Sequence, residues 1–286
     1  MYSTLFADKK LAEFAVYSLY EDLHRLRPLR GDLHAHSFRS DGSRDPAALA
    51  GHFREQGYDF LTLTDHNRFY PGGSRMHNVC SDFARILLKS GMFDAYEVVG
   101  GMGQLGVNLS VALWNDLRAE GCRIPAVGSS DVHSIAKSFV FPHLFTVCFA
   151  EANENDAIIS AVKNGLCVAV EATGTEYERH YRCYGSLRLV TYAQFLLNHY
   201  FPHYTRVCQG EGVAMRAYAM GDADKALIEL QADQARQYSD RFFGRESAPL
   251  PSAAMLAFEA KWREAQLNGP LTRGGTVDAP PITRQI

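Results

Sequence analysis

Long hydrophobic runs and an excess of positive charge are both missing from this chain of 286 residues. No stretch approaches the ~18 consecutive apolar residues that a transmembrane helix requires, so we expect no membrane association. Lys and Arg number 29 against 32 Asp and Glu, a formal net charge of −3. This balance excludes a basic nucleic-acid footprint over the whole chain, and we expect no stable complex with nucleic acid.

The cysteines lack the spacing of a disulfide framework or a zinc knot. The six are scattered and contain no C-x-x-C motif, which indicates reduced and mostly buried thiols. Charged residues at Asp8, Lys9 and Lys10 interrupt the position where an export signal needs its apolar region. We therefore expect a cytoplasmic protein.

Ordinary globular composition and strand-helix alternation are what the sequence does have. Hydrophobic residues make up 47% and charged residues 21%, a balance typical of folded domains. Apolar runs at 29–33, 58–63 and 123–127 each end in a polar turn, and helices are predicted over 46–56 and 109–119. This alternation predicts an α/β fold with a parallel sheet or barrel, whose ligands collect at the carboxyl ends of the strands.

Histidine and aspartate follow each of the three apolar runs. His34 and His36 are one residue apart at the end of a strand, so their side chains share one face. Oxygen and nitrogen donors of this kind suit zinc, manganese or iron. The donors in the three turns are His34, His36, Asp41, His66, Asp131 and His133.

Each of these motifs is weak by itself. An isolated H-x-H is more often two ordinary histidines, and the segments TDHN and SSDVH are also typical of turns and helix caps. Three such clusters at equivalent places in successive strand units are harder to explain as turns. The convergence predicts a metal site.

The segments GDLHAHSFRSDG, YDFLTLTDHN and IPAVGSSDVHS, in this order, resemble the first, second and fourth motifs of the PHP (polymerase and histidinol phosphatase) family. The resemblance is to its stand-alone metal-dependent phosphoesterase branch and covers roughly 29–171. The later segment YGSLRLVTYAQFLLNHYFP is similar to a C-terminal extension of that branch. The resemblance implies a distorted seven-stranded β/α barrel, incomplete here, with a helical C-terminal extension.

The resemblance also implies an activity and a ligand set. It implies two or three divalent metal ions (zinc, manganese or iron) that activate a water molecule to hydrolyse a small phosphorylated substrate, with no protein nucleophile. The ligands implied for one ion are His34, His36 and Asp131, and those for another are Asp41, His66 and His133. Arg39 and Ser130 are candidates to contact the phosphate, although both also suit ordinary turn positions.

One family motif is missing from its expected place. PHP proteins carry a third motif with a metal-bridging glutamate and a histidine, and the stretch FYPGGSRMHNVCSDFARILL has no matching pattern. His77 and Glu97 are the candidates to substitute for it, and neither is a strong one. Two alternatives therefore stay open: a catalytically impaired remnant that binds metal or nucleotide, and an amidohydrolase-like enzyme, which the lack of a strand-end lysine disfavours.

The expected organisation has four segments. An N-terminal helix occupies 1–28, a PHP-like metal-binding domain 29–172, a helical extension 173–245, and a helix with a loose tail 246–286. The sequence does not predict an oligomeric state.

Overall fold

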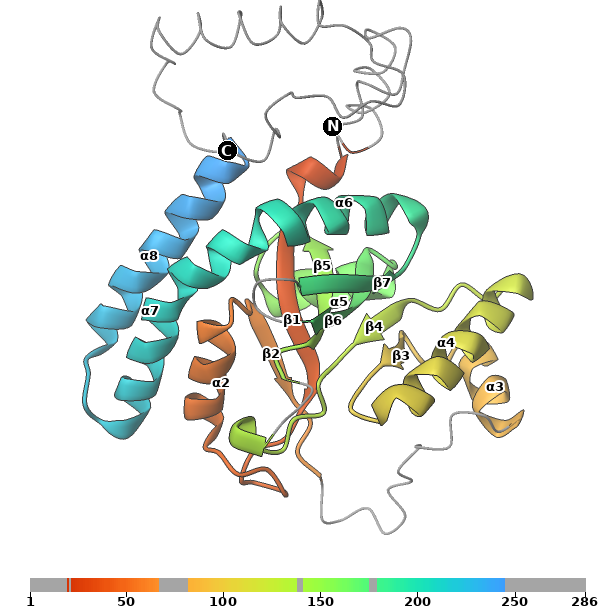
Figure 1. The fold of residues 1–286 in the computed structure, drawn as a ribbon, viewed down its shortest axis with the longest axis horizontal. Coiled ribbons are helices and arrows are strands. Elements are labelled where there is room, and N and C mark those ends of the chain that lie inside the picture. The colour runs from red at the N-terminus through yellow and green to blue at the C-terminus, as the bar shows by residue number, and fades with distance from the viewer. Residues whose placement is uncertain (1–19, 21, 67–81, 138–140, 175–178, 245–286) are drawn as a thin grey trace, which may run out of the picture. The chain divides into compact units, whose positions relative to one another are not determined.

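In a computed structural model, the strands that carry the histidine motifs lie among the helices of the described part of the chain (Figure 1). The structure describes residues 20, 22–66, 82–137, 141–174 and 179–244. The chain divides into two units, 19–239 and a second formed by 1–18 with 240–286, and the description below concerns the first. Most of the predicted N-terminal helix and the whole segment 246–286 lie outside the described residues.

Five strands form the main sheet, in the order β2-β1-β5-β6-β7. Strands β1 and β2 are parallel, whereas β1–β5, β5–β6 and β6–β7 are antiparallel. A second sheet holds the parallel pair β3–β4. The strands are β1 (Arg27–Ala35), β2 (Phe60–Leu63), β3 (Tyr96–Val99), β4 (Ala126–Gly128), β5 (Leu144–Ala150), β6 (Cys167–Gly174) and β7 (Arg179–Tyr184).

The two sheets meet beyond the carboxyl end of β1. Over Arg27–Gly31, β1 pairs with β5. Further along, the His36 N–H donates to the Val132 carbonyl and the Asp131 N–H donates to the His34 carbonyl. The segment after β4 therefore runs alongside the end of β1, so the first and third histidine motifs become neighbours.

The predicted α/β class is confirmed, but the described residues form no closed barrel. They contain seven strands, as many as the resemblance implies, yet these lie in two sheets. The parallel arrangement expected throughout holds only for β1–β2 and β3–β4. The reason is that β6 starts beside the end of β5, with Cys148 opposite Cys167, and so runs antiparallel to it.

Helices pack against the sheets. The Asp45 side chain accepts from the N–H groups of Ala47 and Ala48 and starts α2, and Ser186 starts α6 in the same way. None of the described helices is long and apolar enough to cross a bilayer. The helices are α2 (Pro46–Glu55), α3 (Asp82–Lys89), α4 (Gly103–Ala119), α5 (Asn155–Lys163), α6 (Leu187–His199), α7 (Phe201–Met220) and α8 (Lys225–Phe242), with a short 3₁₀ helix at Ile135–Lys137.

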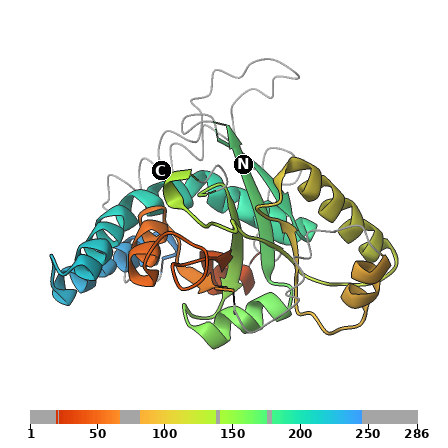
Figure 2. The same cartoon turned by 90° about the horizontal axis from the view of Figure 1, so that it is seen from below.

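The core lies between the sheets and these helices. All seven residues of β5 are buried, because this strand is in the middle of the main sheet. Helix α4 packs Val107, Leu113 and Leu117 into a cluster that includes Val98 and Val99 of β3. This packing holds the β3–β4 sheet, and with it the turn after β4, in place. Figure 2 shows α3 and α4 together on one side of the molecule.

Helices α2 and α7 lie side by side and approach closely at two glycines (Figure 1). A Cβ added at Gly212 would lie 2.5 Å from the Gly51 carbonyl oxygen and would overlap the backbone nitrogen of Glu55. Backbone atoms cannot move aside as a flexible side chain can. The contact therefore requires glycine at position 212.

We expect Gly212→Ala to lower the free energy of unfolding by about 1–3 kcal/mol, the usual cost of overpacking. The matched control is Gly210→Ala, two residues away on α7, where an added Cβ meets the flexible side chain of Gln231. Because alanine favours the helix over glycine, this control should be neutral or stabilising. Urea unfolding followed by circular dichroism measures both, and equal effects would contradict the proposed contact.

Candidate metal centre

Three donor atoms form a nearly equilateral triangle at the carboxyl end of β1. The His34 Nε2 lies 3.1 Å from the His36 Nε2. The Asp131 Oδ1 lies 3.2 Å from the first nitrogen and 3.1 Å from the second. Zinc-nitrogen distances of about 2.0–2.1 Å in a tetrahedral site place neighbouring donors about 3.3 Å apart. The spacing therefore matches one face of a metal coordination shell.

Glu97 on β3 determines which nitrogen of the His34 ring carries the proton. Its Oε2 lies 3.0 Å from the His34 Nδ1, and a carboxylate accepts from that nitrogen only when the nitrogen carries a proton. Proton placement on Nδ1 leaves the lone pair of Nε2 facing Asp131 and His36. Carboxylate-histidine pairs of this kind commonly orient metal-binding histidines.

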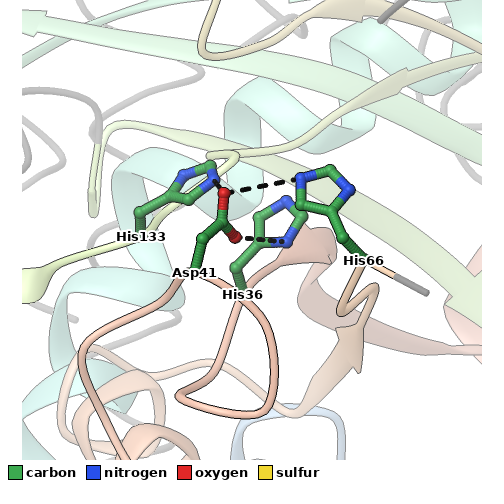
Figure 3. Close-up of side chains that lie close together, drawn as sticks. All are labelled: His36, Asp41, His66 and His133. Atoms are coloured by element: carbon green, nitrogen blue, oxygen red, sulfur yellow. Dashed lines mark ion pairs between the residues drawn. The ribbon is translucent and has the colours of Figure 1, made fainter. Parts of the chain in front are cut away.

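A second group of donors surrounds Asp41 (Figure 3) and shares His36 with the triangle. The Asp41 Oδ2 lies 3.3 Å from the His133 Nε2 and 3.6 Å from the His66 Nε2, while its Oδ1 lies 3.6 Å from the His36 Nδ1. His133 Nδ1 donates to the Asp131 carbonyl at 2.9 Å. This bond keeps the proton on Nδ1 and leaves Nε2 free to bind a metal ion.

His36 lies between the two groups and is their least exposed member. It is 1% exposed, and its Nδ1 has no hydrogen-bond partner among the described residues. A buried ring nitrogen without a partner is costly unless something else satisfies it. The Nδ1 faces the Asp41 Oδ1 at 3.6 Å, and a proton on Nδ1 would leave the Nε2 lone pair available to an ion at the triangle.

The turn that carries Asp41 is held by Asp65. The Asp65 Oδ1 accepts from the Ser37 N–H at 2.7 Å and from the Ser40 hydroxyl at 2.9 Å. Its Oδ2 accepts from the Ser37 hydroxyl at 2.7 Å. A Cβ at Gly42 would overlap the His36 carbonyl, so the turn also needs a glycine there. Asp65 thus positions the loop between two candidate ligands.

Asp32 connects the segment of His34 with the segment of Ser130 from within the core. It is fully buried, and it accepts from the His34 N–H at 2.9 Å and from the Ser130 N–H at 3.0 Å. Burial raises the pKa of this carboxyl to about 7. Its place in the motif GDLHAH was available in the sequence, since a charged residue inside an apolar strand needs a partner.

The backbone at Asp131 is in the left-handed region, with φ of 51°. Among residues with a Cβ, Asp and Asn tolerate this conformation best. Such backbone conformations are concentrated at functional sites because the surrounding structure must maintain them. Here they direct the Asp131 carboxylate toward His34 and His36.

Burial and the neighbouring side chains of the cluster shift the pKa values of its histidines and of Asp41. Burial, followed by the charges of His133 and His34, lowers the pKa of His36. The hydrogen bond with Glu97 raises the pKa of His34 despite burial. Burial opposes the change at Asp41, but the surrounding histidines, His133 foremost, lower the pKa of this carboxyl. A neutral His36 next to an ionised Asp41 is the state that binds cations.

The structure brings all six candidate ligands together, as one group of His34, His36 and Asp131 and a second of His36, Asp41, His66 and His133. It does not bring Arg39 into the cluster: this residue lies in an exposed turn. Ser130 is fully buried and touches Asp32 through its backbone. His77 lies outside the described residues. Glu97 is placed against His34 and outside both donor groups, a role that its position in an apolar strand did not predict.

We expect Glu97→Ala to weaken the binding of Zn²⁺ by about 10–100-fold, the usual effect of removing the partner of a metal-binding histidine. Glu97→Gln keeps an acceptor for the His34 Nδ1 and should lose less. Competition with a chromogenic chelator measures the affinity. The control is Glu151→Ala, at an exposed carboxylate; an equal loss in both variants would contradict the assigned role.

Comparisons with known proteins find little similarity. No protein-family model and no curated protein matches the chain. A crystal structure from Bacteroides vulgatus ATCC 8482, of a two-domain protein containing a predicted PHP-like metal-dependent phosphoesterase, aligns with a TM-score of 0.40 and 16% identity. The alignment covers 51% of this chain and 65% of that one, so the chain spans less than two thirds of that protein.

Proposed function

We propose that this protein is a metal-dependent hydrolase of phosphate esters, of the PHP type. The observation that carries the proposal is the triangle of donor atoms from His34, His36 and Asp131, with the His34 proton held away from it by Glu97. A lone pair, a buried imidazole and a carboxylate directed at one point are suited to a divalent cation. The order and spacing of the three motifs support phosphate esters as the substrate class.

The second group extends the site toward solvent. Asp41, His66 and His133 are 48%, 56% and 38% exposed at their side chains, compared with 1% for His36. A substrate can therefore reach the site from this side. Zn²⁺, Mn²⁺ or Fe²⁺ bound here would lower the pKa of a coordinated water and neutralise charge on the phosphoryl oxygens.

The chain's own residues have separate tasks in this proposal. His34, His36 and Asp131 bind the inner ion, and Asp41, His66 and His133 bind the outer one. Glu97 orients His34, while Asp65 and Asp32 hold the loops that carry the ligands. Arg39, next to Asp41 in the exposed turn, remains a candidate to contact the phosphate.

Elemental analysis of protein purified without chelator tests the metal site, and an assay with phenyl phosphate tests the hydrolysis. We expect about two equivalents of zinc, manganese or iron per chain, and phenyl phosphate hydrolysis that stops on dialysis against EDTA and returns with metal. Less than about half an equivalent would contradict the metal site. Full metal content without hydrolysis would instead favour the non-catalytic alternative.

A further inference from the structure

A cavity lies beside Glu97, the residue that orients His34. Its volume is about 410 Å³, within the roughly 300–1,000 Å³ of small-molecule pockets. Gly100 lines it, and a Cβ at Gly100 would overlap the Glu97 Oε1, the carboxylate that contacts His34. A Cβ at the next residue, Gly101, would lie 2.8 Å from the Asp131 Cβ. The cavity therefore lies close to Glu97 and to the candidate ligand Asp131, although none of the six candidate ligands lines it.

Four polar side chains that can form hydrogen bonds line this cavity. Glu171, 8% exposed, and Thr173 come from β6, Gln104 from the first turn of α4, and His143 from the start of β5. The His143 Nδ1 is buried without a hydrogen-bond partner among the described residues. A ligand without polar groups would leave Glu171 and His143 desolvated, which is costly.

Charge at the cavity disfavours a second anionic group. No lysine or arginine is among the described residues that line it. Arg182, which pairs with Glu171 at 3.2 Å, is not part of the lining. Burial, then the charges of Arg179 and Arg30, lowers the pKa of His143, which favours the neutral ring. A phosphate in this cavity would face a carboxylate without a lining cation.

We infer that this cavity binds the alcohol part of the phosphate ester, and that this part is neutral and hydroxylated, as a sugar is. The inference rests on the proposed hydrolase function, because the metal centre would hold the phosphate at the adjoining end. Hydroxyl groups can donate to Glu171 and exchange hydrogen bonds with Thr173, Gln104 and His143. The preferred substrates are then sugar monophosphates, ahead of aryl phosphates and sugar bisphosphates.

Binding of phosphonates tests the inference without turnover, because their P–C bond resists hydrolysis. Calorimetry on the metal-loaded full chain would compare a ribose 5-phosphonate, phenylphosphonate, and the ribose analogue with a second phosphate. We expect the ribose compound to bind about tenfold more tightly than either of the others, the effect of one or two hydrogen bonds. Equal affinities, or tightest binding of the doubly charged compound, would overturn the inference.

Variants locate the preference in the cavity. Glu171→Gln and Thr173→Val should each remove most of the tenfold preference while leaving phenylphosphonate affinity within about twofold, and Glu151→Gln should change neither. Thr173→Val serves if Glu171→Gln does not fold. A preference that survives both variants would overturn the inference. Loss of phenyl phosphate hydrolysis with an intact binding preference would contradict only the hydrolase proposal, so the two failures are distinguishable.

Discussion

Asp131→Asn is expected to lower the affinity for the inner metal ion by at least about 100-fold and to abolish hydrolysis of phenyl phosphate. Loss of an outer partner already weakens metal binding by about 10–100-fold, and Asp131 is a proposed direct ligand. Asparagine tolerates the left-handed backbone at φ of 51°, so the chain should still fold. Metal content after gel filtration, together with the rate of phosphate release, measures the result.

The control for this variant is Asp45→Asn. Asp45 accepts hydrogen bonds at the start of α2, and asparagine caps helices equally well, so metal content and activity should not change. Undiminished metal binding by the Asp131 variant would contradict the triangle of donors. Undiminished hydrolysis would contradict the mechanism.

Asp59→Ala is expected to have the largest effect on stability, a loss of about 3–5 kcal/mol, because it breaks a buried ion pair. Asp59 is 2% exposed, and its Oδ1 lies 2.9 Å from an Arg54 guanidinium nitrogen. Tyr204 of α7 donates to the same oxygen, and the Arg30 N–H donates to Oδ2. Alanine would leave these donors without their shared acceptor.

Asp94→Ala is the matched control for Asp59→Ala. Asp94 also pairs with a cation, Lys163 at 3.2 Å, but its side chain is 64% exposed. Exposed ion pairs contribute about 0–1 kcal/mol, so this variant should unfold close to the parent chain. Urea denaturation measures the free energy of unfolding of both variants. A difference between them below about 1 kcal/mol would contradict a stabilising role for the buried pair.

The ligand candidates were accessible from the sequence because their chemistry is local. His34 and His36 share a face by strand periodicity. Asp41 and His66 each lie in the turn that follows an apolar run. The helix predicted over 46–56 matches α2 to within about one residue, and the helix predicted over 109–119 matches the end of α4 but lacks its first six residues. Helix α7 was not singled out, because two glycines interrupt its pattern and its packing partner α2 lies far away in the sequence.

The sequence by itself determined which donors this protein has and that they lie at or after the ends of strands. The resemblance implied which donors would share one point, and only the tertiary structure gave the physical cause, the hydrogen bonds between the end of β1 and the segment after β4. The tertiary structure alone also revealed the role of Glu97, whose carboxylate reaches the His34 Nδ1 from a different sheet. It alone decided the open arrangement of the strands, because the partner of each strand edge depends on contacts between residues distant in the sequence and not on local periodicity.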